Sequence, residues 1–315
     1  MTRYLISHGV GMAASLHCPG MYCGRVRFAD SGNFSDCGAC PRGFRVEASV
    51  CEECVSSPEV YDWLYLGFMV LVSVYAQGWI IDRAPRVIKY RALVLQVCCL
   101  LENLLAAVLS LLSVPPTGSL LLTTCPVKRL SDWYTLLHNP SPYYKQTLHC
   151  SQEAVYPFYS IVFVFLGYSL VLLVLIRGFL LPRMFSSFSI EAIRKTIYLT
   201  LYAIPIIAVG HAIFAGLFYY TFSYLVILLS VFSVACHMAA RPNQTARKLI
   251  SDSLELRNLV IIVSHWLIHG FGLIASLIND YGLDSFYSLL LIPLPTAFYV
   301  YTARYTDPEL NYRYL

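Results

Sequence analysis

The amino-acid sequence predicts an all-α membrane protein with seven transmembrane helices and a small N-terminal cysteine-rich lumenal module. Of its 315 residues, 57% are hydrophobic and only 13% are charged, a composition too apolar for an ordinary soluble domain. Seven apolar stretches each approach the roughly 20 residues that a helix needs to cross a bilayer. A cluster of cysteines precedes the first of these stretches.

Connections of different lengths separate the seven predicted spans. Pro205, Pro293 and Pro295 are expected to kink the fourth and seventh helices, because neighbouring helices can satisfy the freed carbonyl groups. A short connection at 218–221 is expected to separate the fourth helix from the fifth. The seven spans are 62–81, 92–114, 158–176, 196–217, 222–240, 258–279 and 285–303.

The basic residues predict the orientation of the chain. Segments 82–91, 177–195 and 241–257 each hold four Lys or Arg residues, and such loops stay in the cytosol. The N-terminus and segment 115–157 are therefore expected in the lumen. This gives a lumenal module over 1–61, a helical domain over 62–303 that includes the lumenal segment 115–157, and a cytosolic tail over 304–315.

The cysteines of the N-terminal module suit either a zinc site or disulfides. In an oxidising lumen, an even set within a segment that has almost no apolar core favours disulfides. Six cysteines allow fifteen pairings, and their spacing does not choose among them. We expect Cys125 and Cys150 to form a fourth bridge in the other lumenal segment. The six cysteines of the module are Cys18, Cys23, Cys37, Cys40, Cys51 and Cys54.

Two glycosylation sequons test this orientation. Asn33 lies in "NFS" within the lumenal module and is predicted to carry a glycan, whereas Asn243 lies in "NQT" in a loop assigned to the cytosol. Only the first should be modified.

The lumenal segment 115–157 is rich in aromatic and leucine side chains. Trp133, Tyr134 and Tyr156 are typical of a strip that lies in the lipid headgroup region. A lumenal cap on the helices is the simpler interpretation, and a surface for partner chains is the alternative.

Polar side chains inside predicted spans are candidates for function, because burying them in lipid is costly. His265 and His269 lie one helical turn apart in "SHWLIHG" and could share a metal in a membrane hydrolase. Ser264 or Glu102 would then serve as a further ligand or as a base. No second motif completes a metal set, so we favour a hydrogen bond between Glu102 and a histidine that fixes helix packing, and we predict neither a metal nor another cofactor. The intramembrane polar residues are Glu102, Asn103, His211, His265 and His269.

The cytosolic loops are too short for a kinase, nucleotide-binding or ligase domain, so cytosolic action would need recruited partners. In "RKLISDSLEL", Arg247 and Lys248 precede Leu254 and Leu256, an order similar to docking peptides of mitogen-activated protein kinases. An amphipathic segment leading into the sixth helix is an equally good interpretation.

Long ordered matches give the chain a family resemblance. The stretches "CGACPRG", "SSPEVYDWLYLGFM", "LSDWYTLLHNPSPYY", "HCSQEAVYPFYSIVF", "SHWLIHGFG" and "YTARYTDP" resemble the Jun-kinase-associated membrane protein (JAMP) family over most of the chain. The resemblance implies a seven-span protein of the endoplasmic reticulum that binds a stress-activated Jun N-terminal kinase. It also implies recruitment of proteasome subunits and a RING-type membrane ubiquitin ligase during degradation of misfolded proteins.

The family supplies no catalytic residues, so the expected function is that of an adaptor and not of an enzyme. The expected surroundings are the lipid bilayer and protein partners, with no nucleic acid. The alternatives are a metal-dependent membrane hydrolase that uses His265 and His269, and a seven-span receptor that binds a ligand through the cysteine module.

Overall fold

A computed structural model describes residues 17–28, 32–83, 89–138, 150–184, 190–241, 244–280 and 283–306. The chain divides into two compact units. Residues 1–57 and 111–163 make up the cysteine-rich unit, and residues 58–110 and 164–315 make up the helical unit. The end of the second predicted span and the beginning of the third therefore belong to the cysteine-rich unit.

Short antiparallel strands build the cysteine-rich unit. Strand β1 (Cys23–Gly24) pairs with β2 (Gly38–Ala39), and β3 (Phe44–Glu47) pairs with β4 (Val50–Glu53). Ala48 and Ser49 connect β3 to β4, and both have positive φ angles, of 47° and 67°. This backbone matches the twist of a tight hairpin, although neither residue is the glycine that usually favours it.

The cysteine-rich unit contains four disulfides, of which two lie within the N-terminal module and two join it to the segment between the second and third predicted spans. The predicted disulfides are confirmed, but the expected bridge between Cys125 and Cys150 is wrong. Each of these two cysteines instead pairs with a residue of the N-terminal module, so both segments fold as one unit. The pairs are Cys18–Cys37, Cys23–Cys150, Cys40–Cys51 and Cys54–Cys125.

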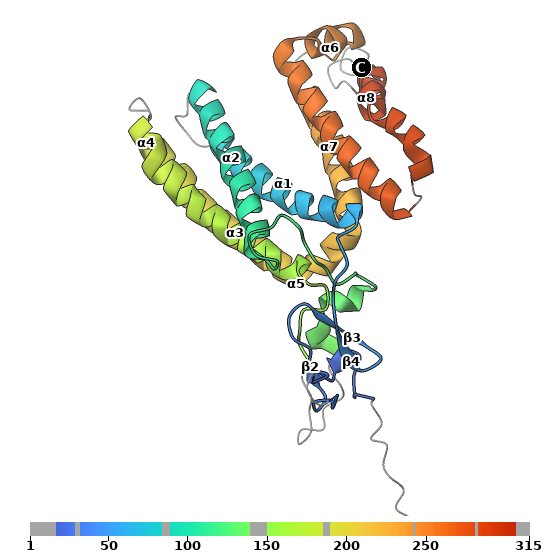
Figure 1. Ribbon diagram of the computed structural model, residues 1–315. Helices are drawn as coiled ribbons and strands as arrows, with labels where there is room; N and C mark the ends of the chain where they lie inside the picture. The colour runs from blue at the N-terminus through green and yellow to red at the C-terminus, as the bar shows by residue number, and fades with distance from the viewer. Residues whose placement is uncertain are drawn as a thin grey trace, which may run out of the picture. The chain divides into compact units, whose positions relative to one another are not determined.

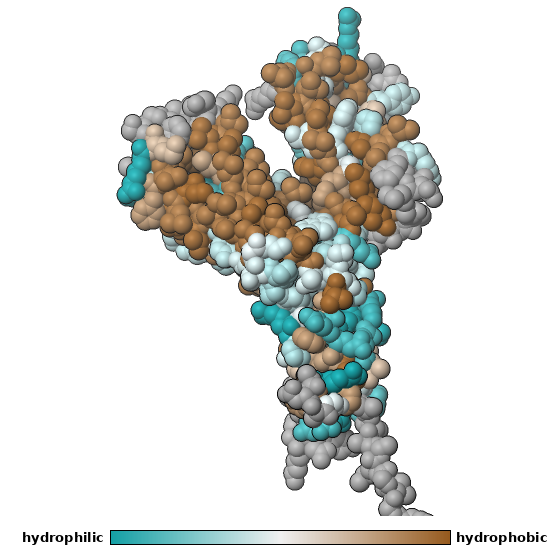
Figure 2. Space-filling view, in the orientation of Figure 1, coloured by the Kyte–Doolittle hydropathy of each residue, from teal (hydrophilic) through white to brown (hydrophobic). Residues whose placement is uncertain are grey.

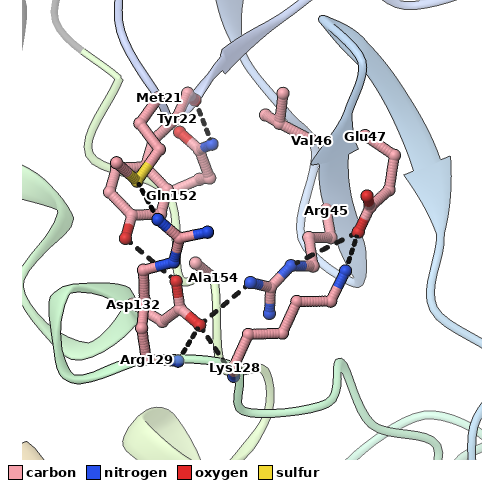
Figure 3. A pocket seen from close by; sticks show the side chains of 10 residues that line it. All are labelled: Met21, Tyr22, Arg45, Val46, Glu47, Lys128, Arg129, Asp132, Gln152 and Ala154. Carbon is pink, nitrogen blue, oxygen red and sulfur yellow. Dashed lines mark hydrogen bonds and ion pairs between the residues drawn. The ribbon is translucent and has the colours of Figure 1, made fainter.

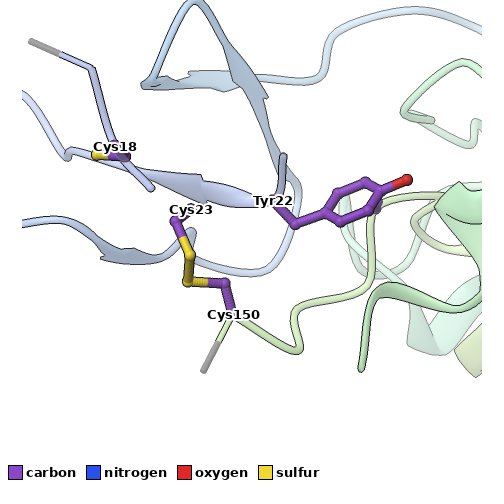
Figure 4. Packing of buried hydrophobic residues seen from close by; sticks show 5 residues of the cluster. Cys18, Tyr22, Cys23 and Cys150 are labelled. Atoms are coloured by element: carbon purple, nitrogen blue, oxygen red, sulfur yellow. A yellow bond between two sulfur atoms is a disulfide. The ribbon is translucent and has the colours of Figure 1, made fainter. Parts of the chain in front are cut away.

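Cystine sulfurs replace an apolar core in this unit. Tyr22 and the Cys23–Cys150 bridge lie together in a buried cluster with Cys18 and Ala154 (Figure 4). A Cβ atom on Gly24 would lie 2.9 Å from the Cys51 sulfur, so only glycine allows β1 to pack this close to the disulfides.

The segment that follows the second span forms two short 3₁₀ helices, η1 (Leu130–Trp133) and η2 (Thr135–His138). The expectation that Trp133 and Tyr156 lie in the headgroup region is wrong, because they are only 6% and 5% exposed. Tyr134 is half-buried, and residues 139–149, which include Tyr143 and Tyr144, lie outside the described residues. Asn33 is described and exposed, whereas Asn243 and tail residues 307–315 lie outside the described part.

Helices make up the rest of the described chain (Figure 1). The third predicted span continues without interruption from α3 through the π-helical turn η3 into α4. The elements are α1 (Val60–Arg83), α2 (Lys89–Ser113), α3 (Phe158–Leu173), η3 (Val174–Leu180), α4 (Leu181–Met184), α5 (Ile190–Ala239), α6 (Ala246–Ser253), α7 (Leu256–Asp280), η4 (Leu283–Leu291) and α8 (Leu294–Thr306).

Five helices of the described chain are long and apolar enough to cross a membrane, and a shorter apolar helix covers Tyr287–Ala303. Their outer surfaces are mostly hydrophobic (Figure 2), as lipid contact requires. The structure is thus a multi-helix membrane protein, and the predicted seven spans correspond to five long helices and one short helix.

The expected connection at 218–221 is wrong, because α5 remains helical throughout its 50 residues. The stretch "FYYT" at this point has no glycine or proline to end a helix. A helix of this length measures about 75 Å, more than twice the hydrocarbon thickness of a bilayer. In Figure 1, α5 bends near its middle, with one half beside η3 and α4 and the other beside α7.

Candidate functional site

The α6 segment, residues 246–256, connects α5 to α7 and contains all four predicted kinase-docking residues. Leu249 is fully buried and anchors α6 to a core formed by α5, α7 and α8. Residues 246–248, 250 and 251 of this short helix are exposed, and Asp252 and Ser253 are half-buried. The buried members of this core are Val234, Met238, Leu249, Ile262 and Ala303.

The outward face of α6 combines one basic side chain with two large apolar ones. Arg247 is exposed, and Ile250 and Leu254 are 52% and 69% exposed. Leu254 keeps helical backbone angles at the end of α6, so it follows Ile250 on the same face at a spacing of four residues. Leu256, 78% exposed, begins α7.

The sequence analysis missed Ile250, which belongs to this exposed face. It chose Leu254 and Leu256 by the alternation of an extended docking peptide. The helical spacing of Arg247, Ile250 and Leu254 was the signal that could have found it.

Lys248 lies on a different face of α6 from this group. Its Nζ contacts Asp252 Oδ1 at 2.9 Å, one helical turn away. The hydrogen bond to Asp252 and the charge of this carboxylate raise the pKa of Lys248 above its usual value. The charge of Lys248 is therefore paired with Asp252, whereas Arg247 has no acidic partner among the described residues.

Side-chain hydrogen bonds hold both ends of the α6 segment. Before α6, Gln244 Nε2 donates to the Arg241 carbonyl at 2.7 Å, and its Oε1 accepts from the Tyr299 hydroxyl at 3.2 Å. After α6, Asn258 Nδ2 donates to the Asp252 carbonyl at 2.7 Å. The exposed face is thus presented on a segment with a fixed helical conformation.

The predicted polar residue Glu102 forms a buried ion pair inside the helical unit. Arg177 Nε donates to Glu102 Oε1 at 3.0 Å, and Arg177 Nη2 lies 2.7 Å from Oε2. Both residues are completely buried. The sequence analysis placed Arg177 in a cytosolic loop, and this is wrong because the third span continues through η3.

Asn103 lies at the centre of a second polar group. Its Oδ1 accepts from Ser73 Oγ at 2.8 Å and from Ser169 Oγ at 3.2 Å, which links α2 to α1 and α3. Gln77 joins the two groups, because its Oε1 accepts from Arg177 Nη2 at 2.8 Å and its Nε2 donates to Asn103 Oδ1 at 3.3 Å. These bonds fix the register of α1, α2 and α3. The partner of Glu102 is Arg177 and not the histidine that we expected.

His211 lies in α5 beside the first turns of α1. Its Nδ1 is 3.4 Å from the Tyr65 hydroxyl, and both side chains are fully buried. Nearby, the Tyr219 hydroxyl donates to Asp62 Oδ1 at 2.6 Å. His211 therefore contributes to the contact between α1 and α5. The other two predicted histidines, His265 and His269, lie in α7.

His265 and His269 face serines of α5. His265 Nδ1 donates to the Ile261 carbonyl at 2.6 Å, and its Nε2 lies 2.6 Å from Ser233 Oγ. His269 Nδ1 lies 2.8 Å from Ser230 Oγ. Among the described residues, no group of three or more His, Cys, Asp or Glu side chains could hold a metal ion.

Together, the long apolar helices, their buried polar contacts and the disulfide-bonded unit define a multi-pass membrane protein. Its candidate functional site is the exposed face of α6. Residues 18–308 match the family described as JNK1/MAPK8-associated membrane protein. The chain belongs to this family, as the sequence resemblance indicated.

Similar proteins from three animals have the same family name. Proteins called JNK1/MAPK8-associated membrane protein from mouse and human are each 38% identical over 296 residues, which cover 93% of this chain and 94% of theirs. A Caenorhabditis elegans protein called JNK1/MAPK8-associated membrane protein homolog is 30% identical over 294 residues, covering 90% of this chain and 88% of its own. No solved structure matches the chain significantly.

Proposed function

We propose that this protein is an adaptor of the endoplasmic reticulum membrane that binds a Jun N-terminal kinase through the exposed face of α6. Membership of the family supports the kinase, since its relatives are described as associated with JNK1/MAPK8. The position of the binding site is supported by the exposed group formed by Arg247, Ile250 and Leu254. Exposed apolar side chains beside a cation are typical of helices that dock into grooves.

The proposal requires α6 to face the cytosol. We count α5 as two spans, one on each side of its bend, and count α8 with η4 as the last span. The helices then cross seven times, so that the cysteine-rich unit is lumenal while α6 and the C-terminus are cytosolic. Each half of α5 has about 25 residues, enough for a hydrocarbon core of about 30 Å. The four disulfides support this orientation because they persist in an oxidising compartment.

The docking mode proposed here differs from that of an extended peptide. Residues 246–253 are helical, and the buried Leu249 would have to leave its core for the segment to become extended. We therefore assign the contact to the helical face, with Leu256 at its edge. Side chains at a spacing of three and four residues would enter a groove of the partner without unfolding α6.

A binding measurement tests this assignment. The full-length protein in nanodiscs is mixed with purified kinase, and bound kinase is measured for the wild type and for Ile250→Ala combined with Leu254→Ala. We expect at least a tenfold loss of affinity, because two exposed apolar contacts are removed. Leu137→Ala is the matched control, since Leu137 is 78% exposed in the cysteine-rich unit. Unchanged kinase binding by the double variant would remove α6 as the docking site.

The adaptor proposal extends to protein degradation through the family resemblance. We infer recruitment of proteasome subunits and a RING-type membrane ubiquitin ligase, with no catalytic step in this chain. Isolation of the protein from microsomes should recover both partners, and His265→Ala should leave their recovery unchanged. Loss of a hydrolytic activity in His265→Ala would instead favour the metal-dependent hydrolase. The geometry of His265 supports the adaptor, because both of its ring nitrogens have protein partners.

A further inference from the structure

The cysteine-rich unit contains a polar cavity of about 90 Å³ beside strand β3 (Figure 3). Arg45 and Glu47 of β3 line one side, and Lys128, Arg129 and Asp132 line the other. Disulfides Cys23–Cys150 and Cys54–Cys125 connect the segments that form these walls. The cavity is therefore formed by parts of the sequence that lie far apart and are cross-linked.

Both carboxylate oxygens of Asp132, at the floor of this cavity, accept hydrogen bonds. Its Oδ2 accepts from Arg45 Nη2 at 2.9 Å and from the backbone N–H groups of Lys128 and Arg129 at 2.9 and 3.0 Å. Its Oδ1 accepts from the Tyr22 hydroxyl at 2.9 Å. With these four donors in place, Asp132 neutralises Arg45 and has little capacity for another cation.

Arg129 has no carboxylate partner within the described residues. Glu47 forms ion pairs with Lys128 and with Arg45, and Asp132 contacts only the backbone of Arg129. Among the described residues, the Arg129 guanidinium donates one hydrogen bond, from Nη1 to the Met21 sulfur at 3.5 Å, and a thioether is a weak acceptor. This exposed guanidinium can thus accept a carboxylate in its planar fork.

Gln152 adds a hydrogen-bond acceptor to the same cavity. Its Nε2 donates to the Tyr22 carbonyl, which points Oε1 elsewhere, and this buried Oε1 has no partner among the described residues. A bare anion could not satisfy an amide oxygen, because it offers no donor. A peptide could satisfy both groups, with a side-chain carboxylate at Arg129 and a backbone N–H at Gln152.

A second cavity, of about 400 Å³, shares Met21 and Val46 with the first. It continues past Ala48 and Ser49 at the turn of the β3–β4 hairpin. The first cavity has room for little more than one carboxylate group. The larger one has room for the residues that flank it in an extended chain.

We propose that this pair of cavities binds an extended peptide segment by an acidic side chain. The carboxylate would bind to Arg129, a backbone N–H would donate to Gln152, and neighbouring residues would lie against Met21 and Val46. The proposal concerns the disulfide-bonded unit and is independent of kinase binding at α6.

A synthetic peptide library tests the proposal on the full-length protein in detergent. The library contains eight-residue peptides with random flanks and either Glu or Gln at one central position, and retained peptides are quantified by mass spectrometry. We expect the wild type to enrich Glu over Gln about tenfold, as a charge-assisted pair at a partly screened site allows. Arg129→Gln should reduce this ratio to less than twofold. Arg27→Gln should preserve it, because Arg27 is an exposed arginine of the same unit that lies over the Phe34 ring.

The same experiment separates the outcomes that contradict the proposal. Equal retention of Glu and Gln peptides, or an unchanged ratio in Arg129→Gln, would show that Arg129 does not select a carboxylate. Titration with inorganic phosphate distinguishes a simple anion site. Phosphate binding that depends on Arg129, without retention of any peptide, would mean that the cavity binds free anions and would overturn the peptide proposal.

Discussion

Arg177 and Glu102 form an ion pair in which Nε donates a hydrogen bond to Oε1 and Nη2 lies 2.7 Å from Oε2, and neither residue is exposed to the surface. The pair joins η3 to α2 within the helical unit. Gln77 of α1 accepts a further hydrogen bond from Arg177 at 2.8 Å, so three segments meet at one guanidinium. The geometry makes each charge depend on the other, because an isolated charge in a dry helix interface is costly.

Removal of one charge of this pair should destabilise the helical unit more than removal of both. We expect Glu102→Gln to lower the free energy of unfolding by about 3–5 kcal/mol, because it leaves the Arg177 charge buried and uncompensated. Combining Glu102→Leu with Arg177→Met should recover most of this loss. Thermal unfolding in detergent measures both variants, followed by a thiol-reactive dye at the buried free Cys99 after Cys98 and Cys236 are replaced by serine in every protein compared. A double variant as unstable as the single one would contradict the account.

Close packing of α5 and α7 depends on Gly272. A Cβ atom there would lie 2.8 Å from Ile227 Cγ1 and 2.9 Å from the Ser223 carbonyl oxygen. Gly272→Ala should therefore lower the unfolding free energy by about 1–3 kcal/mol through overpacking. Gly210→Ala in α5 is the control, because a Cβ atom there would meet nothing within 4 Å. Equal melting temperatures for the two variants would mean that the helices are not this close.

The disulfide pattern predicts which cross-linked peptides a non-reducing digest contains. Mass spectrometry should find Cys125 joined to Cys54 and Cys150 joined to Cys23. Cys125→Ser should free the thiol of Cys54 and leave the bridge at Cys150 intact. A peptide that joins Cys125 to Cys150 would disprove this pattern and would detach segment 115–157 from the N-terminal module.

Tyr22 should make the cysteine-rich unit sensitive to alkaline pH. Burial, and to a lesser extent the nearby Asp132, raise the pKa of its hydroxyl to about 12 from an ordinary value of 10. The unfolded chain therefore loses this proton first, so the stabilising contribution is complete below pH 10 and is lost as pH rises to about 12. Stability of the wild type should fall across this window more steeply than that of Tyr22→Phe. Parallel pH profiles for the two proteins would exclude Tyr22 as the cause.

The sequence predicted the parts of this fold that depend on local composition. Apolar stretches located the long helices of the described chain, although they divided α5 into two spans, and cysteine content within a small segment predicted disulfides. The pairing of Cys125 with Cys54 was not predictable, because nearness in sequence favoured Cys150, whereas the folded strands bring Cys54 closer. Arg177 was likewise assigned to a loop, because the sequence does not show that its charge is paired with the buried carboxylate of Glu102.

The candidate site was only partly predictable for a related reason. The order of basic and apolar residues located the α6 segment, but the choice between an extended and a helical conformation decides which leucines and isoleucines share a face. Leu249 settles this choice by packing into the core of α5, α7 and α8, a contact between distant segments. Ile250 becomes part of the site only as a consequence.

The orientation of the chain underlies both the kinase proposal and the disulfide-bonded unit, and the two sequons measure it together. Asn33 belongs to the cysteine-rich unit, and Asn243 immediately precedes α6. We would compare gel mobility after endoglycosidase H digestion for the wild type, Asn33→Gln and Asn243→Gln. The account predicts a sensitive glycan that is lost only in Asn33→Gln, which would place the cysteines in the lumen and α6 in the cytosol. A glycan that depends on Asn243 would contradict it, because α6 would then lie on the lumenal side, out of reach of a cytosolic kinase.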